Sequence, residues 1–167
     1  MTTKEKSFKP GSILVVEDRP HNIELLTVIL SLQGYKVEQA NQGSLAIRSA
    51  MARPPDIILL DISQPEMDSF AVCQQLKADP HTQDIPIIFI SAANETEPKI
   101  KAFESGASDY ITKPFQIEEV IARINNQLQI SRFKIELKAK NAHLERELLK
   151  RQLAAKKLLS LNQQLGK

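Results

Sequence analysis

The stretch Asp56-Ile-Ile-Leu-Leu-Asp61 decides the fold of this chain. Its four apolar residues lie between Pro55 and Pro65, and a short apolar run bounded in this way predicts a β-strand buried on both faces. An acid at the end of such a strand lies at the edge where open α/β sheets bind their ligands. We therefore expect Asp61 to be central to function. The alternative is a carboxylate that only caps the following turn.

The bulk composition is that of a soluble globular protein. Hydrophobic residues make up 42% of the 167 positions, yet no apolar run approaches the length of a membrane span. Residues 1–10 are polar and contain lysines, so they do not have the pattern of a secretory signal. The single cysteine, Cys73, rules out an internal disulfide and fits a reducing compartment. We expect a cytoplasmic protein.

Charge divides the chain into two parts. Residues 1–127 carry 12 Lys/Arg and 17 Asp/Glu, a net charge of −5, whereas residues 128–167 carry 10 and 3, a net charge of +7. Glycine is also confined almost entirely to the first part. We expect a flexible N-terminus over residues 1–11, one domain over residues 12–130 and a helical coiled-coil extension over residues 131–167.

Short apolar runs alternate with helical patterns through the first domain. Five repeats of strand followed by helix predict a parallel sheet with helices on both faces. The fourth run begins beside Pro86, and proline is tolerated at the first residue of a strand. The expected strands are Ser12–Val16, Tyr35–Gln39, Asp56–Asp61, Ile85–Ile90 and Asp109–Thr112.

Polar side chains follow four of these strands: Glu17 and Asp18, Asp61, Ser91 and Lys113. Carboxylates gathered at one sheet edge raise one another's pKa unless a cation lies among them, and Mg²⁺ suits one to three carboxylates. Lys113 adds a charge that can hold a phosphate oxygen. The set predicts a phosphoryl-transfer site in which a carboxylate can be the attacking group. Each member alone could be an ordinary surface residue, and no glycine-rich nucleotide motif accompanies them.

These segments resemble the receiver domain of two-component response regulators over residues 12–128. The resemblance implies a flavodoxin-like (βα)5 doubly wound parallel sheet with strand order 2-1-3-4-5, followed here by the long C-terminal helix. The matching pieces are Glu17-Asp18, Asp61 with Pro65-Glu66-Met67-Asp68, Ser91-Ala92, and Asp109-Tyr110-Ile111-Thr112-Lys113-Pro114-Phe115.

The resemblance also implies the roles of the acids. Asp61 would be the phosphoacceptor, taking a phosphoryl group from the phosphohistidine of a sensor histidine kinase or a phosphotransfer protein. Glu17, Asp18 and Asp61 would bind Mg²⁺ together with the backbone carbonyl of Ser63. On this basis the chain is a switch rather than an enzyme, with at most self-catalysed phosphorylation and dephosphorylation.

Three further residues complete the implied switch. Lys113 would hold the phosphoryl group, Ser91 would move to bond it, and Tyr110 would swing inward with Ser91. The face made by the fourth helix, the fifth strand and the fifth helix would then repack and could serve for dimerisation. The Lys113–Pro114 peptide bond is expected to be cis, which proline makes energetically accessible.

The sequence departs from the family pattern without losing a chemical group. Gln64 stands in place of the usual methionine, Ser69 in place of the usual glycine, and Glu17 in place of the commoner aspartate. Ser63 and Ala93 would flank the acyl phosphate, and neither is an acid or an amide that could orient an attacking water. We therefore predict slow self-dephosphorylation.

No proline or glycine interrupts residues 117–165. Leucine-rich positions at heptad spacing predict a dimeric coiled coil whose helix orientation stays open, although Lys134 and Arg151 weaken the seam. The alternative is a single amphipathic helix folded onto the domain. The d positions are Ile130, Leu137, Leu144, Arg151, Leu158 and Leu165, and the a positions are Lys134, Asn141, Leu148, Ala155 and Asn162.

Other functions are still open at this stage. The chain could be the N-terminal regulatory part of a larger signalling enzyme, or a dimerisation module that is not phosphorylated. A small phosphohydrolase with an aspartyl nucleophile usually carries Asp-x-Asp after its first strand, where this chain has Glu17-Asp18-Arg19. The basic extension has no helix-turn-helix pattern, so we expect a solvated face rather than a nucleic-acid partner.

Overall fold

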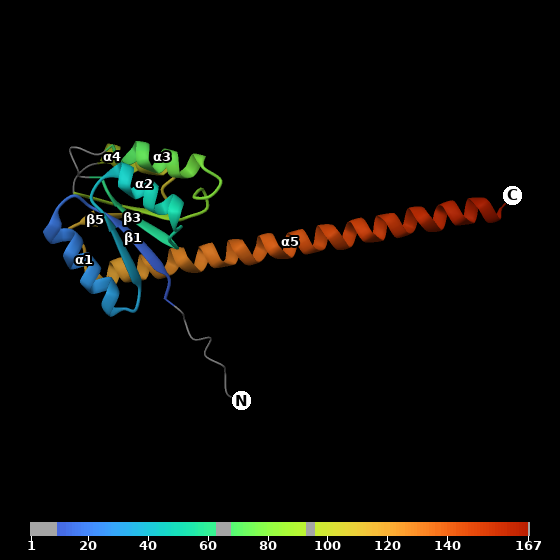
Figure 1. The fold of residues 1–167 in the computed structure, drawn as a ribbon, viewed down its shortest axis with the longest axis horizontal. Coiled ribbons are helices and arrows are strands. Elements are labelled where there is room, and N and C mark those ends of the chain that lie inside the picture. Colours follow the sequence, from blue (N-terminus) through green and yellow to red (C-terminus); the bar gives the residue numbers. More distant parts are fainter. Residues whose placement is uncertain (1–9, 63–67, 93–95, 167) are drawn as a thin grey trace, which may run out of the picture. The chain divides into compact units, whose positions relative to one another are not determined.

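The computed structural model describes residues 10–62, 68–92 and 96–166, with the side chains of residues 96–99 excluded. The chain divides into two units, residues 1–131 and 132–167, which we treat separately. In the described residues, strands and helices alternate along the chain (Figure 1). The strands are β1 (Ser12–Val16), β2 (Lys36–Ala40), β3 (Ile57–Asp61), β4 (Ile87–Ala92) and β5 (Asp109–Lys113). The helices are α1 (Pro20–Leu32), α2 (Gly43–Ala52), α3 (Ser69–Ala78), α4 (Thr96–Glu104) and α5 (Ile117–Leu165).

The strands form one parallel sheet in the order β2-β1-β3-β4-β5, which confirms the predicted doubly wound fold. Strand β3 lies at the centre, where Ile58 is paired with Leu14 of β1 and Ile87 of β4. The side chains of residues 57–60 are completely buried. An apolar run without alternation is therefore explained by a strand that has helices over both of its faces.

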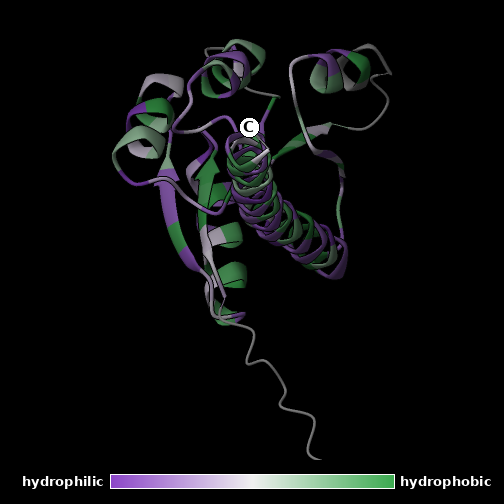
Figure 2. Ribbon diagram, turned by 90° about the vertical axis from the view of Figure 1, so that its right-hand side faces the viewer, coloured by the Kyte–Doolittle hydropathy of each residue, from purple (hydrophilic) through white to green (hydrophobic). Residues whose placement is uncertain are grey.

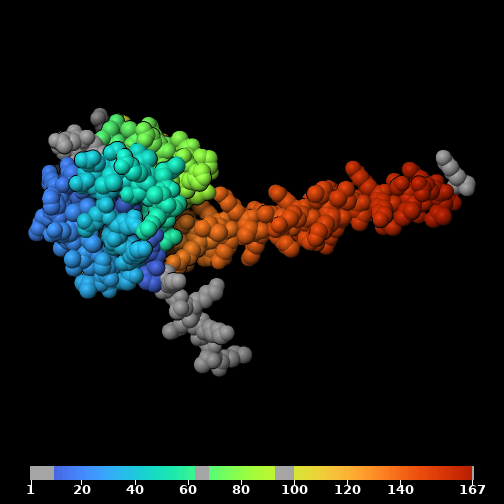
Figure 3. Space-filling model, in the orientation of Figure 1, coloured from blue at the N-terminus to red at the C-terminus, as the bar shows by residue number. Residues whose placement is uncertain are grey.

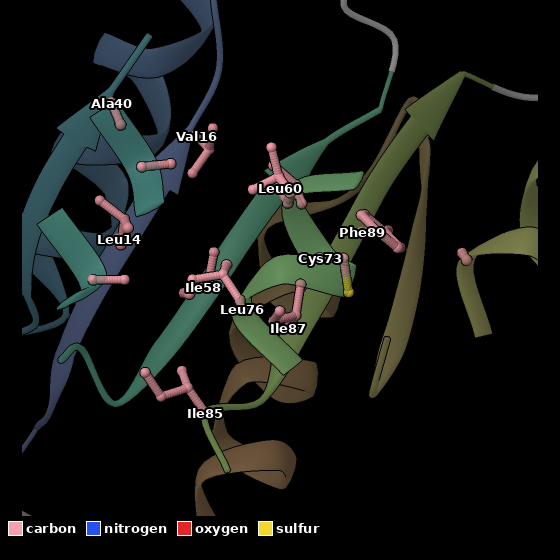
Figure 4. Packing of buried hydrophobic residues seen from close by; sticks show 14 of the residues in the cluster. Leu14, Val16, Ala40, Ile58, Leu60, Cys73, Leu76, Ile85, Ile87 and Phe89 are labelled. Carbon is pink, nitrogen blue, oxygen red and sulfur yellow. The ribbon is translucent and has the colours of Figure 1, made fainter. Parts of the chain in front are cut away.

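Each face of the sheet packs against its own helices because successive side chains of a strand point to opposite sides. On one face, Ile58 and Leu60 pack with Leu76 and Cys73 of α3 (Figure 4). On the other face, strand residues such as Leu59 pack with α1 and with the first turns of α5. The α1 and α5 residues of this second core are Ile23, Leu26, Leu30, Val120, Ile124 and Leu128.

Three strands begin later than the sequence predicted, and β3 starts at Ile57 rather than Asp56. Strand β4 starts at Ile87 rather than Ile85 because Pro86 has no N–H for the ladder, although its carbonyl accepts from the N–H of Ile58 at 3.0 Å. Strand β2 starts at Lys36 because the N–H of Tyr35 donates to Leu30 at 3.2 Å and closes the end of α1. The intervening Gly34 has a φ of +90°, a conformation that glycine adopts without strain.

Two helices carry apolar residues near helical spacing that are not buried. In α1, Leu25 and Leu32 are 51% and 79% exposed, while the buried positions recur at intervals of three and four residues. In α4, Ile100 and Phe103 are also exposed. A helix that packs on a sheet buries only one stripe of its surface, and sequence spacing alone does not show where that stripe ends.

The second unit consists of the helical residues 132–165 of α5, shown in orange and red in Figure 3. Its leucine side chains at the predicted d positions are exposed in the single chain. Colouring by hydropathy shows apolar and polar residues interspersed along this helix (Figure 2). Among the described residues, no helix is long and apolar enough to cross a membrane.

Candidate functional site

The carboxyl ends of three strands bring Glu17, Asp61 and Lys113 together. Glu17 follows β1 directly, and its N–H donates to Ala40 at 3.0 Å. Asp61 is the last residue of β3, and Lys113 is the last residue of β5. Because the strands are parallel, both strand ends lie at the same edge of the sheet. The ammonium group of Lys113 forms an ion pair with Asp61 Oδ2 and lies 3.8 Å from Glu17 Oε2. Both carboxylates are 2% exposed, so the described residues form a buried acidic site with one cation.

The raised pKa of Glu17 shows that the charged form of its side chain is disfavoured in this cluster. Burial raises the pKa of Glu17 to about 7, with further contributions from a hydrogen bond with Asp61 and from the charge of Asp61. Lys113 and the N–H of Arg19, which donates to Glu17 Oε1 at 3.2 Å, act in the opposite direction. Burial and the neighbouring Asp61 therefore outweigh the effect of Lys113 on the pKa of Glu17.

Glu17 and Asp61 lie beside a single lysine, and their carboxylate oxygens are ligands that a hard divalent cation prefers. Asp18 is half-buried and lines a hollow of about 460 Å³ with Asp68 and the start of α2. Among the residues that the structure describes, no group of three His, Cys, Asp or Glu side chains is already arranged as a metal site. Ser63 lies outside the described residues, and its backbone carbonyl is a metal ligand only by the family resemblance.

The predicted switch residues contact each other. The Ser91 side chain, on β4, is hydrogen bonded to the hydroxyl of Tyr110, and Ser91 Oγ also donates to the carbonyl of Ala92 at 3.1 Å. Tyr110 is only 6% exposed, so its side chain already occupies an inward position in this structure. The Lys113–Pro114 peptide bond is cis, as the family resemblance implied.

The Tyr110 backbone connects to the first turns of α5. The carboxylate of Asp109 accepts from the N–H of Tyr110 at 2.8 Å and from Arg123 Nη1 at 2.8 Å. Arg123 Nε also donates to Glu119 at 3.1 Å. These bonds connect the start of β5 to the first turns of α5.

Ser69 is a site residue that the sequence analysis noted only as a departure from the family. Its hydroxyl is buried and donates to the backbone carbonyl of Asp61 at 2.8 Å. The preceding Asp68 caps α3 by accepting from the N–H of Ala71 at 3.1 Å. In the sequence, Ser69 is recognisable only as a small hydroxyl residue directly after a helix cap. That pattern does not show which carbonyl its hydroxyl contacts.

A second hollow of about 280 Å³ lies beside the acids. Glu17 and Lys113 line it together with Asn22 and Leu25 of α1 and with Phe115. The hollow therefore combines the charged groups of the site with apolar side chains from the two flanking elements.

The fold and the site together define a doubly wound α/β domain with an acidic edge and one lysine. The chain belongs to the response regulator receiver domain family, whose model matches residues 13–125. It is 41% identical over 117 residues to the DNA-binding dual master transcriptional regulator RpaA of Synechocystis sp., covering 70% of this chain and 48% of that protein. It is 39% identical over 140 residues to a probable cyclic di-GMP phosphodiesterase of Vibrio cholerae, covering 84% of this chain and 32% of that protein.

The chain thus spans about half, or less, of the length of these curated relatives. Among solved structures, it is similar to the receiver domain of the sensor histidine kinase PA1611 from Pseudomonas aeruginosa, with a TM-score of 0.67 and 28% identity. That match covers 72% of this chain and 98% of the other. The PA1611 receiver domain has a magnesium ion coordinated in its active site cleft.

Proposed function

We propose that Asp61 accepts a phosphoryl group from the phosphohistidine of a sensor histidine kinase or a phosphotransfer protein. The observation that carries this proposal is the Lys113–Asp61 ion pair, buried beside Glu17 at the edge of the sheet. A buried carboxylate held against a lysine is positioned both to attack phosphorus and to have the resulting charge stabilised.

In the proposed reaction, an Asp61 carboxylate oxygen forms a bond to phosphorus as the phosphorus–nitrogen bond of the phosphohistidine breaks. The electron pair of that bond leaves with the imidazole, which then takes up a proton. Lys113 lies close enough to Asp61 to bond an oxygen of the transferred group. The neighbouring hollow, with Asn22 and Phe115 in its wall, provides room for the donor.

Magnesium fits the proposed site because the two buried acids outnumber the single lysine. Glu17, Asp18 and Asp61 would hold the ion, together with the backbone carbonyl of Ser63. When bound, Mg²⁺ supplies positive charge at the phosphoryl oxygens.

Phosphorylation would act on the Ser91–Tyr110 hydrogen bond. A phosphoryl group on Asp61 adds acceptor oxygens that compete with the Ala92 carbonyl for the hydrogen of the Ser91 hydroxyl. If Ser91 turns to the phosphoryl group, Tyr110 loses this partner, and the α4-β5-α5 face acquires a second arrangement. The Asp109–Arg123 ion pair lies on the same face and would be affected by the same movement.

Incubation with acetyl phosphate and Mg²⁺, followed by intact-mass measurement, tests the proposal. We expect a stable adduct with the mass of one phosphoryl group, which Asp61→Asn abolishes and the exposed control Asp84→Asn retains. Turnover of a phosphoester without a stable adduct would instead indicate an aspartyl phosphohydrolase. No reaction at all would indicate a dimerisation module that is not phosphorylated.

The tail supports a second part of the proposal, in which residues 131–167 join two receivers and connect them to an output. The match to the Vibrio cholerae relative extends over 140 residues, and that relative is about three times as long as the matched part. The second candidate function is therefore the regulatory front end of a larger signalling enzyme. Residues 132–165 form one continuous helix rather than a helix-turn-helix, so we expect no nucleic-acid partner for them.

Sedimentation equilibrium of the full chain, compared with a version ending at residue 131, tests this second part. We expect the full chain to dimerise more tightly than the truncated one. Equal association of both would instead place the dimer interface on the α4-β5-α5 face.

A further inference from the structure

The a and d positions of residues 134–165 form a row of leucines interrupted by polar residues, and its leucines are exposed in the single chain. The exposed fractions of Leu137, Leu144, Leu148 and Leu158 lie between 57% and 64%. They all occupy a or d positions of the heptad repeat, so they share one side of the helix. Exposed leucines in such a row are stabilised when a second helix covers them.

We propose that the same row of a second copy covers it, with the two helices parallel and in register. This inference rests on the proposed dimer and goes beyond it by assigning the orientation of the helices. Two observations carry the assignment: the polar residues within the row and the charged residues beside it.

The asparagines within the row favour the parallel arrangement. In a parallel, in-register pair, Asn141 faces Asn141 of the second copy, and the two side-chain amides can hydrogen bond to each other. Asn162 is matched with itself in the same way. In an antiparallel pair with full overlap, Asn141 would face Leu158 and Asn162 would face Leu137. Both amides would then be buried without a partner, which is unfavourable.

The flanking charges favour the same orientation. Lys140 occupies a g position and Glu145 the following e position, and a parallel pair places each beside the other residue of the second copy. The dimer would contain this ion pair twice. With full antiparallel overlap, Lys140 would lie near Leu161 and Glu145 near Gln152. Moving the antiparallel pair by one heptad would place Glu145 against itself.

Two basic residues within the row act against the parallel arrangement. Lys134 and Arg151 each face their own copy there and repel it, whereas in the antiparallel pair they would face leucines. Their side chains are long enough to bring the charged group to water at the edge of the interface, which the shorter asparagine side chain cannot do. The asparagine pairing therefore decides the orientation, and the two basic layers make the dimer weak and dependent on concentration.

Charge reversal in the full chain tests the orientation. Lys140→Glu and Glu145→Lys should each weaken the dimer about tenfold, because two attractive pairs become repulsive. The double variant should restore the dimerisation constant to within about threefold of the original. Lys157→Glu, which makes the same charge change at an outward-facing position, should change it by less than about threefold. Sedimentation equilibrium provides the dimerisation constants of the original chain and of the four variants.

Disulfide formation gives an independent readout in a Cys73→Ala background. Leu144→Cys should cross-link to itself in the parallel dimer. In the antiparallel dimer position 144 faces position 155, so cross-links would form only in a mixture of Leu144→Cys and Ala155→Cys chains.

The possible outcomes separate this inference from the proposed function. A dimer without charge rescue and without the 144–144 cross-link would overturn the parallel orientation and leave dimerisation intact. A monomer at all concentrations would overturn the dimer as well, while phosphorylation of Asp61 is tested separately. A tetramer would show that the opposite side of the helix, with Ile135, Leu149 and Leu153, is also covered, and would overturn the two-stranded arrangement.

Discussion

The hydroxyl of Ser69 donates a hydrogen bond to the backbone carbonyl of Asp61 across 2.8 Å. This bond joins the first residue of α3 to the last residue of β3, and both residues are 2% exposed. If the Ser69 hydroxyl were removed, the buried Asp61 carbonyl could not form a replacement hydrogen bond with bulk water. Ser69 therefore helps to hold the backbone of the proposed phosphoacceptor in place.

Replacing Ser69 with alanine should lower the free energy of unfolding by about 1–2 kcal/mol, because the Asp61 carbonyl loses a buried donor. Urea denaturation followed by circular dichroism measures this change, with an unchanged dependence on urea concentration. Ser31→Ala, on the exposed side of α1, is the matched control and should change the free energy by less than about 0.5 kcal/mol. Equal effects of the two substitutions would show that the Ser69 hydroxyl does not stabilise the site.

Replacing Lys113 with methionine should slow phosphorylation by acetyl phosphate about 10- to 100-fold, because the transferred group loses its cationic partner. Methionine keeps most of the side-chain volume. The initial rate of adduct formation, measured by intact mass, checks this expectation. Lys36→Met, at an exposed position of β2, controls for the change in net charge. A rate for Lys113→Met within twofold of the original would rule out the proposed role.

The elements of the fold could be predicted from the sequence because their causes are local. The buried strand Ile57–Leu60 is an apolar run between breakers, and helix α1 runs from Pro20 to near Gly34, as those residues predict. The exposure of Leu25 and Leu32 could not be predicted in the same way. It depends on which side of α1 meets the sheet, and that is a tertiary property.

The candidate site shows the same division. Parallel strands bring their carboxyl ends to one edge, so the proximity of Glu17, Asp61 and Lys113 follows from the strand order. The hydrogen bond of Ser69 to Asp61 and the inward position of Tyr110 do not follow from it. They depend on side-chain rotamers and on packing around the site, which neighbouring residues in the sequence do not determine.

The hydrogen bond between Ser91 and Tyr110 should appear as an energetic coupling between the two residues. Ser91→Ala and Tyr110→Phe each remove one hydroxyl of the pair, and the double variant removes both. The double-mutant cycle should give a coupling of about 1 kcal/mol in the free energy of unfolding. The cycle should be repeated on protein phosphorylated with acetyl phosphate, where we expect a smaller coupling because Ser91 bonds the phosphoryl group instead. The same coupling in both states would argue against the proposed switch.

Loss of the phosphoryl group from Asp61 should be slow. Ser63 and Ala93, the flanking positions implied by the family resemblance, lie outside the described residues and carry no acid or amide that could orient water. Introducing Glu at position 93 should therefore speed dephosphorylation, and Ala93→Gln should act in the same direction. The decay of the intact-mass adduct after removal of acetyl phosphate measures both. A half-life of only seconds for the unmodified chain would contradict the prediction.

The buried thiol of Cys73 should make stability depend on pH in the alkaline range. Cys73 is fully buried in α3, and burial raises the pKa of its thiol above the ordinary value of about 9.0. In the unfolded chain the thiol ionises near that ordinary value, so above it the unfolded state binds fewer protons than the folded state. The stability is therefore fully present below pH 9 and decreases as the pH rises through the window between the two pKa values.

Comparison with Cys73→Ala isolates this effect, because lysine and tyrosine ionisation is common to both chains. The free energy of unfolding of the original chain should fall relative to that of the variant as the pH rises above 9. The same burial should make Cys73 react with a thiol reagent only after urea is added, whereas a cysteine introduced at the exposed position Ser160 should react at once. Parallel pH dependences of the two chains, or rapid labelling of native Cys73, would show that the thiol is not protected by the core.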